Sequence, residues 1–271
     1  MSSPYTDYPV YIGGTASNQF VPAIDVSVDY TSAAQAKRKL GTNIGTTDQF
    51  GYNRPLDAKI SINSIVHTGM ESGFAFLQEV DRAKATTIRL GDIDFNDCYA
   101  TDVSVKIKPF EPVTIQSNFI CLNPETGTQI KGTNPYNLDM SGDGVAYGYA
   151  CSVNDQADVL NNVQSEIQFT RRYLRTPSYT LGSIGATSMF LDEIEEELVI
   201  TSTGLESLIN YSGDVLTDTL DVAINSVGIG ITTPITDLIS FKEGATVDTE
   251  NFFIRGGEAL QTSATIKQAT L

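Results

Sequence analysis

The sequence predicts a mainly β protein with two tandem β-sandwich or barrel-like domains, each carrying one short helix. Two observations lead to this prediction: apolar and polar residues alternate along many stretches, and one phrase occurs twice at about half the length of the 271-residue chain. The first copy, VDYTSAAQAKRKLG, begins at Val28, and the second, IQFTRRYLRTPSYTLG, begins at Ile167. Both open with an apolar, a polar and an aromatic residue and a threonine, then carry basic residues and end in Leu-Gly.

Alternation with a period of two residues predicts the strands. It is clearest in three stretches of each half of the chain: 59–66, 102–109 and 112–119 in the first, and 198–203, 219–231 and 262–268 in the second. These stretches are rich in Thr, Val and Ile, and Gly, Asn, Asp and Pro separate them. That combination is typical of antiparallel sheets with one face in water.

Two short segments have helical spacing instead. In residues 72–85 the apolar residues Phe74, Leu77 and Val80 are three apart, which predicts an amphipathic helix. In residues 232–244 a threonine precedes a proline and an apolar stripe, an order that suits a helix N-terminus. The residues concerned are Thr233, Pro234, Ile235, Leu238 and Ile239, and this second helix is expected to end near Gly244.

The order of these elements is similar in the two halves and predicts a tandem duplication, with chance similarity between two β-rich halves as the alternative. Residues 123–150 are dense in Gly, Pro, Asn and Asp and lack periodicity, so they indicate a linker or a protruding loop. We therefore divide the chain into an N-terminal arm, a first β-domain, the linker or loop, and a second β-domain: residues 1–22, 23–125, 126–160 and 161–271.

Composition argues against several functions. The chain carries 33 acidic and 17 basic side chains, so it repels phosphate and cannot grip nucleic acid by neutralising the backbone. No apolar run reaches the length of a membrane span, and the first residues have no secretory pattern. The chain has an odd number of cysteines, and their spacing is not that of metal ligands: they are Cys98, Cys121 and Cys151. They argue against a disulfide framework and a zinc site and favour folding in a reducing cytoplasm.

A search for catalytic and ligand-binding patterns predicts no enzyme and no cofactor. His67 is the only histidine, and it ends an alternating strand without a nucleophile motif elsewhere. The segment DMSGDG at Asp139–Gly144 begins like a calcium loop, but Ala150 occupies the position that needs a bidentate glutamate. A Gly-Asp turn is the simpler interpretation. We therefore expect no catalytic residues and no metal site.

The most informative charged segment is LDEIEEELVI, which begins at Leu191. It can form a helix with one apolar stripe, or a strand with Glu193, Glu195 and Glu197 together on one face. The β-rich continuation and the match to LDAKISINS, from Leu56, favour the strand. Like charges at alternate positions repel each other, so either this face is simply solvated or an external function maintains the charges.

With these features the chain resembles the tail tube proteins of long-tailed bacteriophages. The resemblance lies in the paired phrases, in the strand-then-helix blocks at residues 59–80 and 220–239, and in the closing segments at residues 95–121 and 251–269. In that family, six β-domains form a ring whose inner wall is a closed β-barrel, and stacked rings make a tube that conducts the genome. The resemblance implies that a chain with two such domains needs three copies per ring.

The resemblance also implies site residues, partners and a location. An acidic lumen lets DNA pass without specific binding. Its candidate lining residues are Glu193, Glu195 and Glu197 in the second domain and Asp57, Lys59 and Ser61 in the less acidic first domain. The implied protein belongs to the virion tail and is assembled in the host cytoplasm, away from membranes. Its implied partners are further copies of itself and other tail proteins, such as sheath, terminator or baseplate proteins.

Two alternatives stay open. One is another virion part, a tail terminator, baseplate hub or decoration protein, because related β-domains occur in those positions. The other is a calcium- or carbohydrate-binding β-sandwich module that uses the loop at Asp139–Gly144 and a stacking surface of Tyr136, Tyr147 and Tyr149. The absence of tryptophan and the incomplete set of acidic ligands argue against this second alternative.

Overall fold

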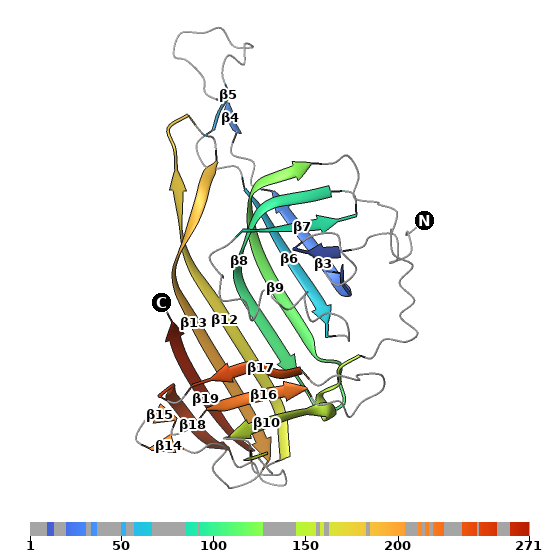
Figure 1. The fold of residues 1–271 in the computed structure, drawn as a ribbon, viewed down its shortest axis with the longest axis vertical. Helices are drawn as coiled ribbons and strands as arrows, with labels where there is room; N and C mark the ends of the chain where they lie inside the picture. The colour runs from blue at the N-terminus through green and yellow to red at the C-terminus, as the bar shows by residue number, and fades with distance from the viewer. Residues whose placement is uncertain are drawn as a thin grey trace.

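The computed structural model confirms the mainly β class. It describes residues 10–13, 20–30, 34–36, 50–52, 57–66, 85–91, 93–126, 145–155, 158–159, 163–182, 185–203, 211–212, 215–216, 219–224, 235–242, 244–253 and 261–270. Nearly all of these residues are in strands (Figure 1). The single helical segment among them is the 3-10 turn Gly148–Ala150.

Thirteen strands form one large antiparallel sheet. They are β1 (Val10–Ile12), β2 (Phe20–Val21), β3 (Ala23–Tyr30), β6 (Ala58–Ile65), β7 (Thr86–Leu90), β8 (Ile93–Ile107), β9 (Thr114–Thr126), β12 (Val163–Tyr179), β13 (Ala186–Thr203), β14 (Tyr211–Ser212), β15 (Val215–Leu216), β18 (Thr246–Phe253) and β19 (Gln261–Thr270). A four-stranded sheet contains β10 (Cys151–Asp155), β11 (Asp158–Val159), β16 (Leu220–Ile224) and β17 (Ile235–Phe241), and β4 (Ala34–Ala36) pairs with β5 (Phe50–Tyr52).

Two runs of four strands within the large sheet have the same order. The first run is β3-β6-β9-β8, and the second is β12-β13-β19-β18. The residues that open the repeated phrase also occupy matching places, because Val28 faces Ile60 on β6 and Ile167 faces Ile200 on β13. The shared strand order supports the predicted duplication, but the duplication and the domain boundaries both stay predictions.

The two runs are joined edge to edge. β8, the last strand of the first run, pairs antiparallel with β12, the first strand of the second run, from Ile107 opposite Ile167 to Asp102 opposite Arg172 (Figure 1). Most of the described buried apolar residues form one cluster that crosses this junction, and Tyr99, Leu122 and Ala186 form a second, small one. The two runs therefore share a core and a continuous sheet.

Further strands complete the core on each side of the junction. The N-terminal half of β8 pairs with β7, which pairs with β1, and Val10 and Ile12 of β1 are buried. Residues 10–12 and 20–21 of the predicted N-terminal arm are thus strands of the chain's own sheet. In the second half, Phe169 of β12 packs edge-on against Phe241 of β17, with ring centroids 6.1 Å apart.

Two other expectations can be compared with the described residues. The predicted helix at residues 232–244 is wrong, because this segment contains β17, in which Ile239 and Phe241 are buried and pair with β16. Pairing with a neighbouring strand outweighed the local spacing. The predicted connection at 126–160 contains β10 and β11. The other predicted helix lies outside the described residues except for Ala85, which is in no helix.

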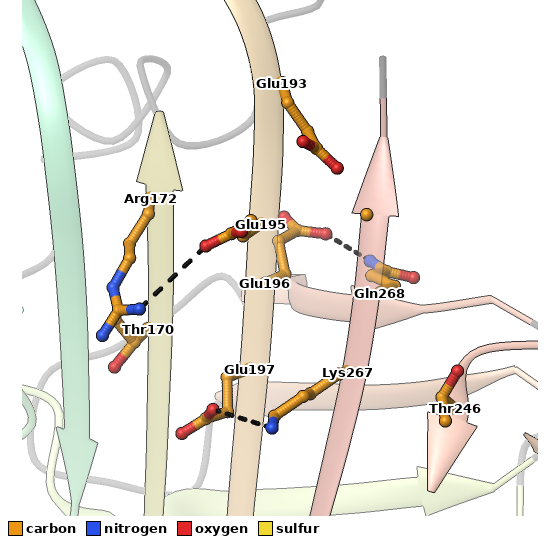
Figure 2. Close-up of a pocket in the computed structure, with 10 residues that line it drawn as sticks. Thr170, Arg172, Glu193, Glu195, Glu196, Glu197, Thr246, Lys267 and Gln268 are labelled. Carbon is orange, nitrogen blue, oxygen red and sulfur yellow. Dashed lines mark hydrogen bonds and ion pairs between the residues drawn. The ribbon is translucent and has the colours of Figure 1, made fainter. Parts of the chain in front are cut away.

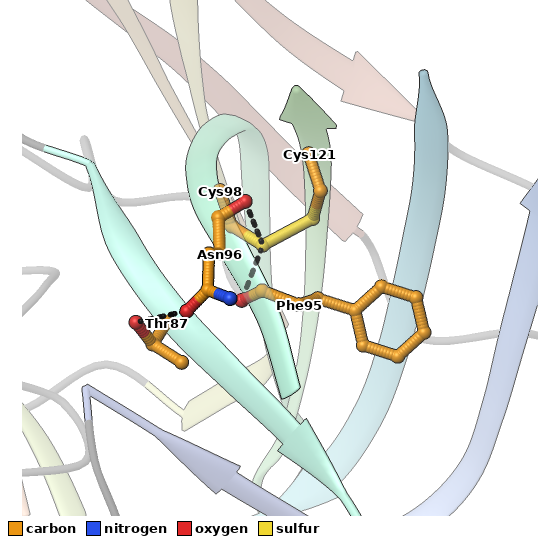
Figure 3. The surroundings of a disulfide bond; sticks show 5 residues. All are labelled: Thr87, Phe95, Asn96, Cys98 and Cys121. Atoms are coloured by element: carbon orange, nitrogen blue, oxygen red, sulfur yellow. Dashed lines mark hydrogen bonds between the residues drawn. A yellow bond between two sulfur atoms is a disulfide. The ribbon is translucent and has the colours of Figure 1, made fainter. Parts of the chain in front are cut away.

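The structure joins Cys98 and Cys121 in a disulfide, which corrects the argument against disulfides from the number and spacing of the cysteines (Figure 3). The two residues face each other on β8 and β9 with Cα atoms 3.9 Å apart, and both are fully buried. Strand register, rather than spacing along the chain, brings them together. Cys98 Sγ also lies 3.2 Å from the Phe95 carbonyl oxygen, which accepts a hydrogen bond when the thiol is reduced.

Candidate functional site

One face of the large sheet is turned away from the core, and we call it the polar face. On β6, for example, Lys59, Ser61 and Asn63 alternate with buried apolar residues. The polar face is continuous, because a row of paired residues crosses both runs of strands. The row consists of Asp25, Asn63, Gln116, Ser104, Thr170, Glu197 and Lys267.

The candidate residues from the sequence all lie on strands of this face or next to them. Glu193, Glu195 and Glu197 are on β13 with their side chains on the polar face, while the alternating residues Ile194, Glu196 and Leu198 are buried. This confirms the prediction of a strand rather than a helix. Lys59 and Ser61 are on β6, and the half-buried Asp57 immediately precedes that strand.

In the second run the polar face is hollowed at the three glutamates (Figure 2). The hollow measures about 370 Å³, and Arg172 and Lys267 also line it. Arg172 Nη1 lies 4.0 Å from a Glu195 carboxylate oxygen, and Lys267 Nζ lies 3.8 Å from Glu197. Lys267 also donates a hydrogen bond of 2.7 Å to Asp248, which raises the pKa of the lysine. Because these pairs are exposed, they contribute little to stability.

The first run has a hollow on the same face, with a volume of about 470 Å³. Asp29, Lys59 and Asp102 line it. Asn118 Nδ2 donates a hydrogen bond of 2.5 Å to Asp102, and Thr101 donates one of 3.1 Å to the other carboxylate oxygen. The polar face is therefore concave in both halves of the chain.

Acidic side chains outnumber basic ones on the described part of the polar face. The acidic residues are Asp25, Asp29, Asp102, Glu166, Glu193, Glu195, Glu197 and Asp248, and the basic residues are Lys59, Lys106, Arg172 and Lys267. The excess of carboxylates gives this surface a negative potential. A surface with this potential repels anions and does not bind them.

A buried polar network lies on the opposite face, and sequence reasoning identified only one member of it. Arg171 of β12 donates a hydrogen bond to Glu196 of β13, and Gln268 of β19 donates one to the other Glu196 oxygen. Arg171 and Glu196 are both buried, and the guanidinium lies 5.3 Å from the Phe169 ring centre. The alternation in LDEIEEELVI placed Glu196 among apolar residues, but its partners follow only from strand pairing.

β12 and β13 continue as a two-stranded hairpin beyond the rest of the sheet (Figure 1). Arg175 fixes its base, because its Nε donates a hydrogen bond of 2.8 Å to the Ala100 carbonyl and its guanidinium stacks on Tyr99 at 5.4 Å. Burial lowers the pKa of Arg175. The far end of the hairpin, which we call the hairpin tip, exposes Tyr179 and Leu181, and Leu181 is 103% exposed. Phe190 is also exposed, but it lies near the base of the hairpin, opposite Thr176.

A second apolar projection lies at the opposite end of the sheet, in the turn between β8 and β9. Phe110 is 86% exposed there, and the backbone N–H of Gly148 donates a hydrogen bond of 3.0 Å to the Glu111 carbonyl of the same turn. On either side of Gly148, the rings of Tyr147 and Tyr149 stack with centroids 5.7 Å apart. We call the three aromatic residues the aromatic end. The backbone is tightly packed, because a Cβ atom at Gly148 would lie 1.9 Å from the Lys108 carbonyl oxygen.

The described residues contain no group of three or more His, Cys, Asp or Glu side chains that could hold a metal ion. Within the same residues no helix is long and apolar enough to cross a membrane. His67, Tyr136 and Asp139–Gly144 lie outside the described residues. Comparison of the sequence with protein-family models and with curated proteins finds no match, so its function has to be argued from this geometry.

Proposed function

We propose that the chain is a structural virion protein whose copies pair edge to edge into trimeric rings that stack into a phage tail tube. The observation that carries this proposal is the pairing of β8 with β12 inside the chain. This junction already joins one four-stranded run to the next, so it is a template for joining one chain to another.

The outer strands of the two joined runs, β3 and β18, correspond to the two strands that pair at the internal junction. Among the described strands, β3 pairs only with β6, and β18 pairs with β19 and, at Thr246, with β15. β3 corresponds to β12, and β18 corresponds to β8. Pairing of β18 in one copy with β3 in the next therefore repeats the internal junction. Such a head-to-tail contact generates a closed ring when the rotation closes, and three copies supply six runs of strands.

The apolar side chains of β3 are incompletely buried, which supports the proposal that a neighbouring strand is missing at that edge. On β12, which β8 covers, the core-facing Ile167 and Phe169 are only 3% and 2% exposed. On β3, Val28, which corresponds to Ile167, and its core-facing neighbour Val26 are only partly buried, and Ile24 is 53% exposed. A strand added to β3 would bury this apolar row and remove an exposed sheet edge.

The concave polar face then forms the inner wall. Its carboxylates, with Glu193, Glu195 and Glu197 at their centre, repel the phosphates of DNA and leave the DNA hydrated. DNA thus passes through the lumen without specific binding. Lys59, Lys106, Arg172 and Lys267 are spread among the carboxylates, so no stretch of the wall is basic enough to hold DNA.

The two apolar projections are suited to stacking, because they lie at opposite ends of antiparallel strands. Copies stacked in one direction bring the hairpin tip of one ring to the aromatic end of the next. The tip residue Tyr179 is 12 residues along β12 from Ile167, which pairs with the last residue of β8. At about 3.3 Å per residue this separation is about 40 Å, which sets the scale of the axial repeat. A terminator or hub needs no such second projection, which favours the tube.

Electron microscopy of the purified protein tests the proposal. We expect rings with pseudo-sixfold symmetry, three chains per ring by native mass spectrometry, and tubes with the repeat given above. Ile24→Glu adds a further negative charge to the β3 edge and should leave a folded monomer. Gln116→Glu, on the central strand β9, is the matched control and should still close rings. A wild-type protein that is monomeric under all conditions, or an Ile24→Glu variant that assembles normally, would contradict the proposal.

A further inference from the structure

The internal junction is complementary in charge. Asp102 of β8 lies opposite Arg172 of β12 in the register. Lys106 Nζ of β8 lies 3.1 Å from a Glu166 carboxylate oxygen on β12. Opposite charges therefore face each other across the strands that join the two runs.

The two open edges differ from it, because they carry carboxylates alone. β3 (AIDVSVDY) contains Asp25 and Asp29, and β18 (TVDTENFF) contains Asp248 and Glu250, without lysine or arginine in either strand. The side chains of Asp25, Asp29 and Asp248 are exposed.

The nearest basic residues lie one strand inward and neutralise these edges incompletely. Lys59 on β6 is opposite Asp29, and Asn63 donates a hydrogen bond of 3.2 Å to Asp25. On the other edge, Lys267 of β19 binds Asp248 at 2.7 Å and also lies 3.8 Å from Glu197. Each edge thus keeps more negative than positive charge.

We propose that these acidic edges make ring closure depend on ionic strength, so that chains stay apart in low salt and close into rings when counter-ions screen the carboxylates. The inference rests on the proposed pairing of β18 with β3 of a second copy. Paired strands lie about 4.8 Å apart, well inside the screening length of about 30 Å in 0.01 M salt. A like-charged pair across strands weakens pairing by about two- to five-fold. Because a trimeric ring has three such junctions, its formation should be weaker by roughly ten- to a hundred-fold.

Sedimentation velocity in 20 mM and 300 mM NaCl, with electron microscopy of the same samples, tests this. We expect ring formation by the wild type to rise at least ten-fold with salt. The variant Asp25→Asn/Asp29→Asn should form rings in 20 mM NaCl as the wild type does in 300 mM, because asparagine keeps the shape and hydrogen bonding of the edge. The control Glu111→Gln/Asp192→Asn removes two exposed carboxylates away from both edges and should keep the salt dependence.

The outcomes separate this inference from the proposed function. Rings that form equally in both salt concentrations overturn the inference and leave the proposed function standing. Loss of the salt dependence in the control also overturns it, because net charge and not edge charge is then responsible. Failure of every variant to form rings in either salt overturns the edge pairing itself and, with it, both proposals.

Discussion

Arg171 and Glu196 form an ion pair inside the protein, directly opposite each other on β12 and β13 and almost completely excluded from solvent. Gln268 on β19 binds the second carboxylate oxygen, so Glu196 is held from both neighbouring strands. A slip of one residue would move these groups to the other face of the sheet. The pair therefore favours one register at the centre of the second run.

Removing one partner of this pair should be strongly destabilising. Glu196→Leu leaves the Arg171 guanidinium buried without its carboxylate, and we expect a loss of about 3–5 kcal/mol in the free energy of unfolding. Urea denaturation measures the loss. The double variant Arg171→Met/Glu196→Leu should recover most of it. Glu195→Gln, in the exposed pair with Arg172, should cost less than about 1 kcal/mol, and an equal loss there would contradict our account.

The disulfide should stabilise the first half of the chain. Its cysteines are 23 residues apart, and closing a loop of that length in the unfolded chain contributes about 3 kcal/mol. We expect Cys98→Ala/Cys121→Ala to lower the urea midpoint by a corresponding amount, and a reductant to do the same to the wild type. Cys151→Ala is the control with one free thiol removed. An unchanged midpoint in both tests would show that the cysteines are reduced in the folded protein.

The Cys151 thiol should be unreactive in the folded protein. Burial raises its pKa from 9.0 to about 12, so at pH 8 about a thousand-fold less thiolate is present than in an ordinary cysteine. The rate of alkylation by iodoacetamide, compared between native protein and protein in guanidinium chloride, measures this difference. Because the folded pKa is the higher one, this group contributes stability below pH 9 that is lost as the pH rises from 9 towards 12. Equal rates in both states would contradict the burial.

Charge reversal on the polar face should create affinity for DNA. Glu195→Lys/Glu197→Lys removes two negative charges from the hollow lined by Arg172 and Lys267 and adds two positive ones there. We expect the assembled variant to bind DNA, with an affinity that falls steeply as salt increases, while the wild type does not bind. Fluorescence anisotropy measures both. Glu111→Lys/Asp192→Lys changes the net charge equally outside this hollow, so equal DNA binding by that variant would argue against the polar face as the DNA path.

The hairpin tip should act in stacking and not in ring closure. Tyr179→Ser/Leu181→Ser removes two exposed large side chains at the tip without touching the described core. We expect single rings in place of long tubes in electron micrographs, with unchanged urea stability. Thr180→Ser/Thr187→Ser, polar substitutions in the same hairpin, should leave tube length unchanged. Tubes of normal length from the first variant would exclude the tip as a stacking surface.

The sequence predicted local features of the sheet well and local features of helices poorly. The β-rich continuation and the match to LDAKISINS identified the strand of Glu193, Glu195 and Glu197. Alternation then showed which side chains share a face, because side chains in a strand alternate between two faces whatever the strand pairs with. The helical spacing at residues 232–244 was misleading. A short apolar segment with this spacing can also form a strand that is buried against a partner. The pairing of this segment with β16 cannot be read from its own spacing.

By itself, the sequence determined the β class, the duplicated phrase and the acidic excess, since composition and periodicity are properties of the chain that folding does not alter. The tertiary structure alone decided which strands are neighbours. It brought Cys98 to Cys121, Arg171 to Glu196 and β8 to β12, contacts set by register between strands far apart in the chain. Many registers satisfy the same alternation, and packing of the whole core selects one of them.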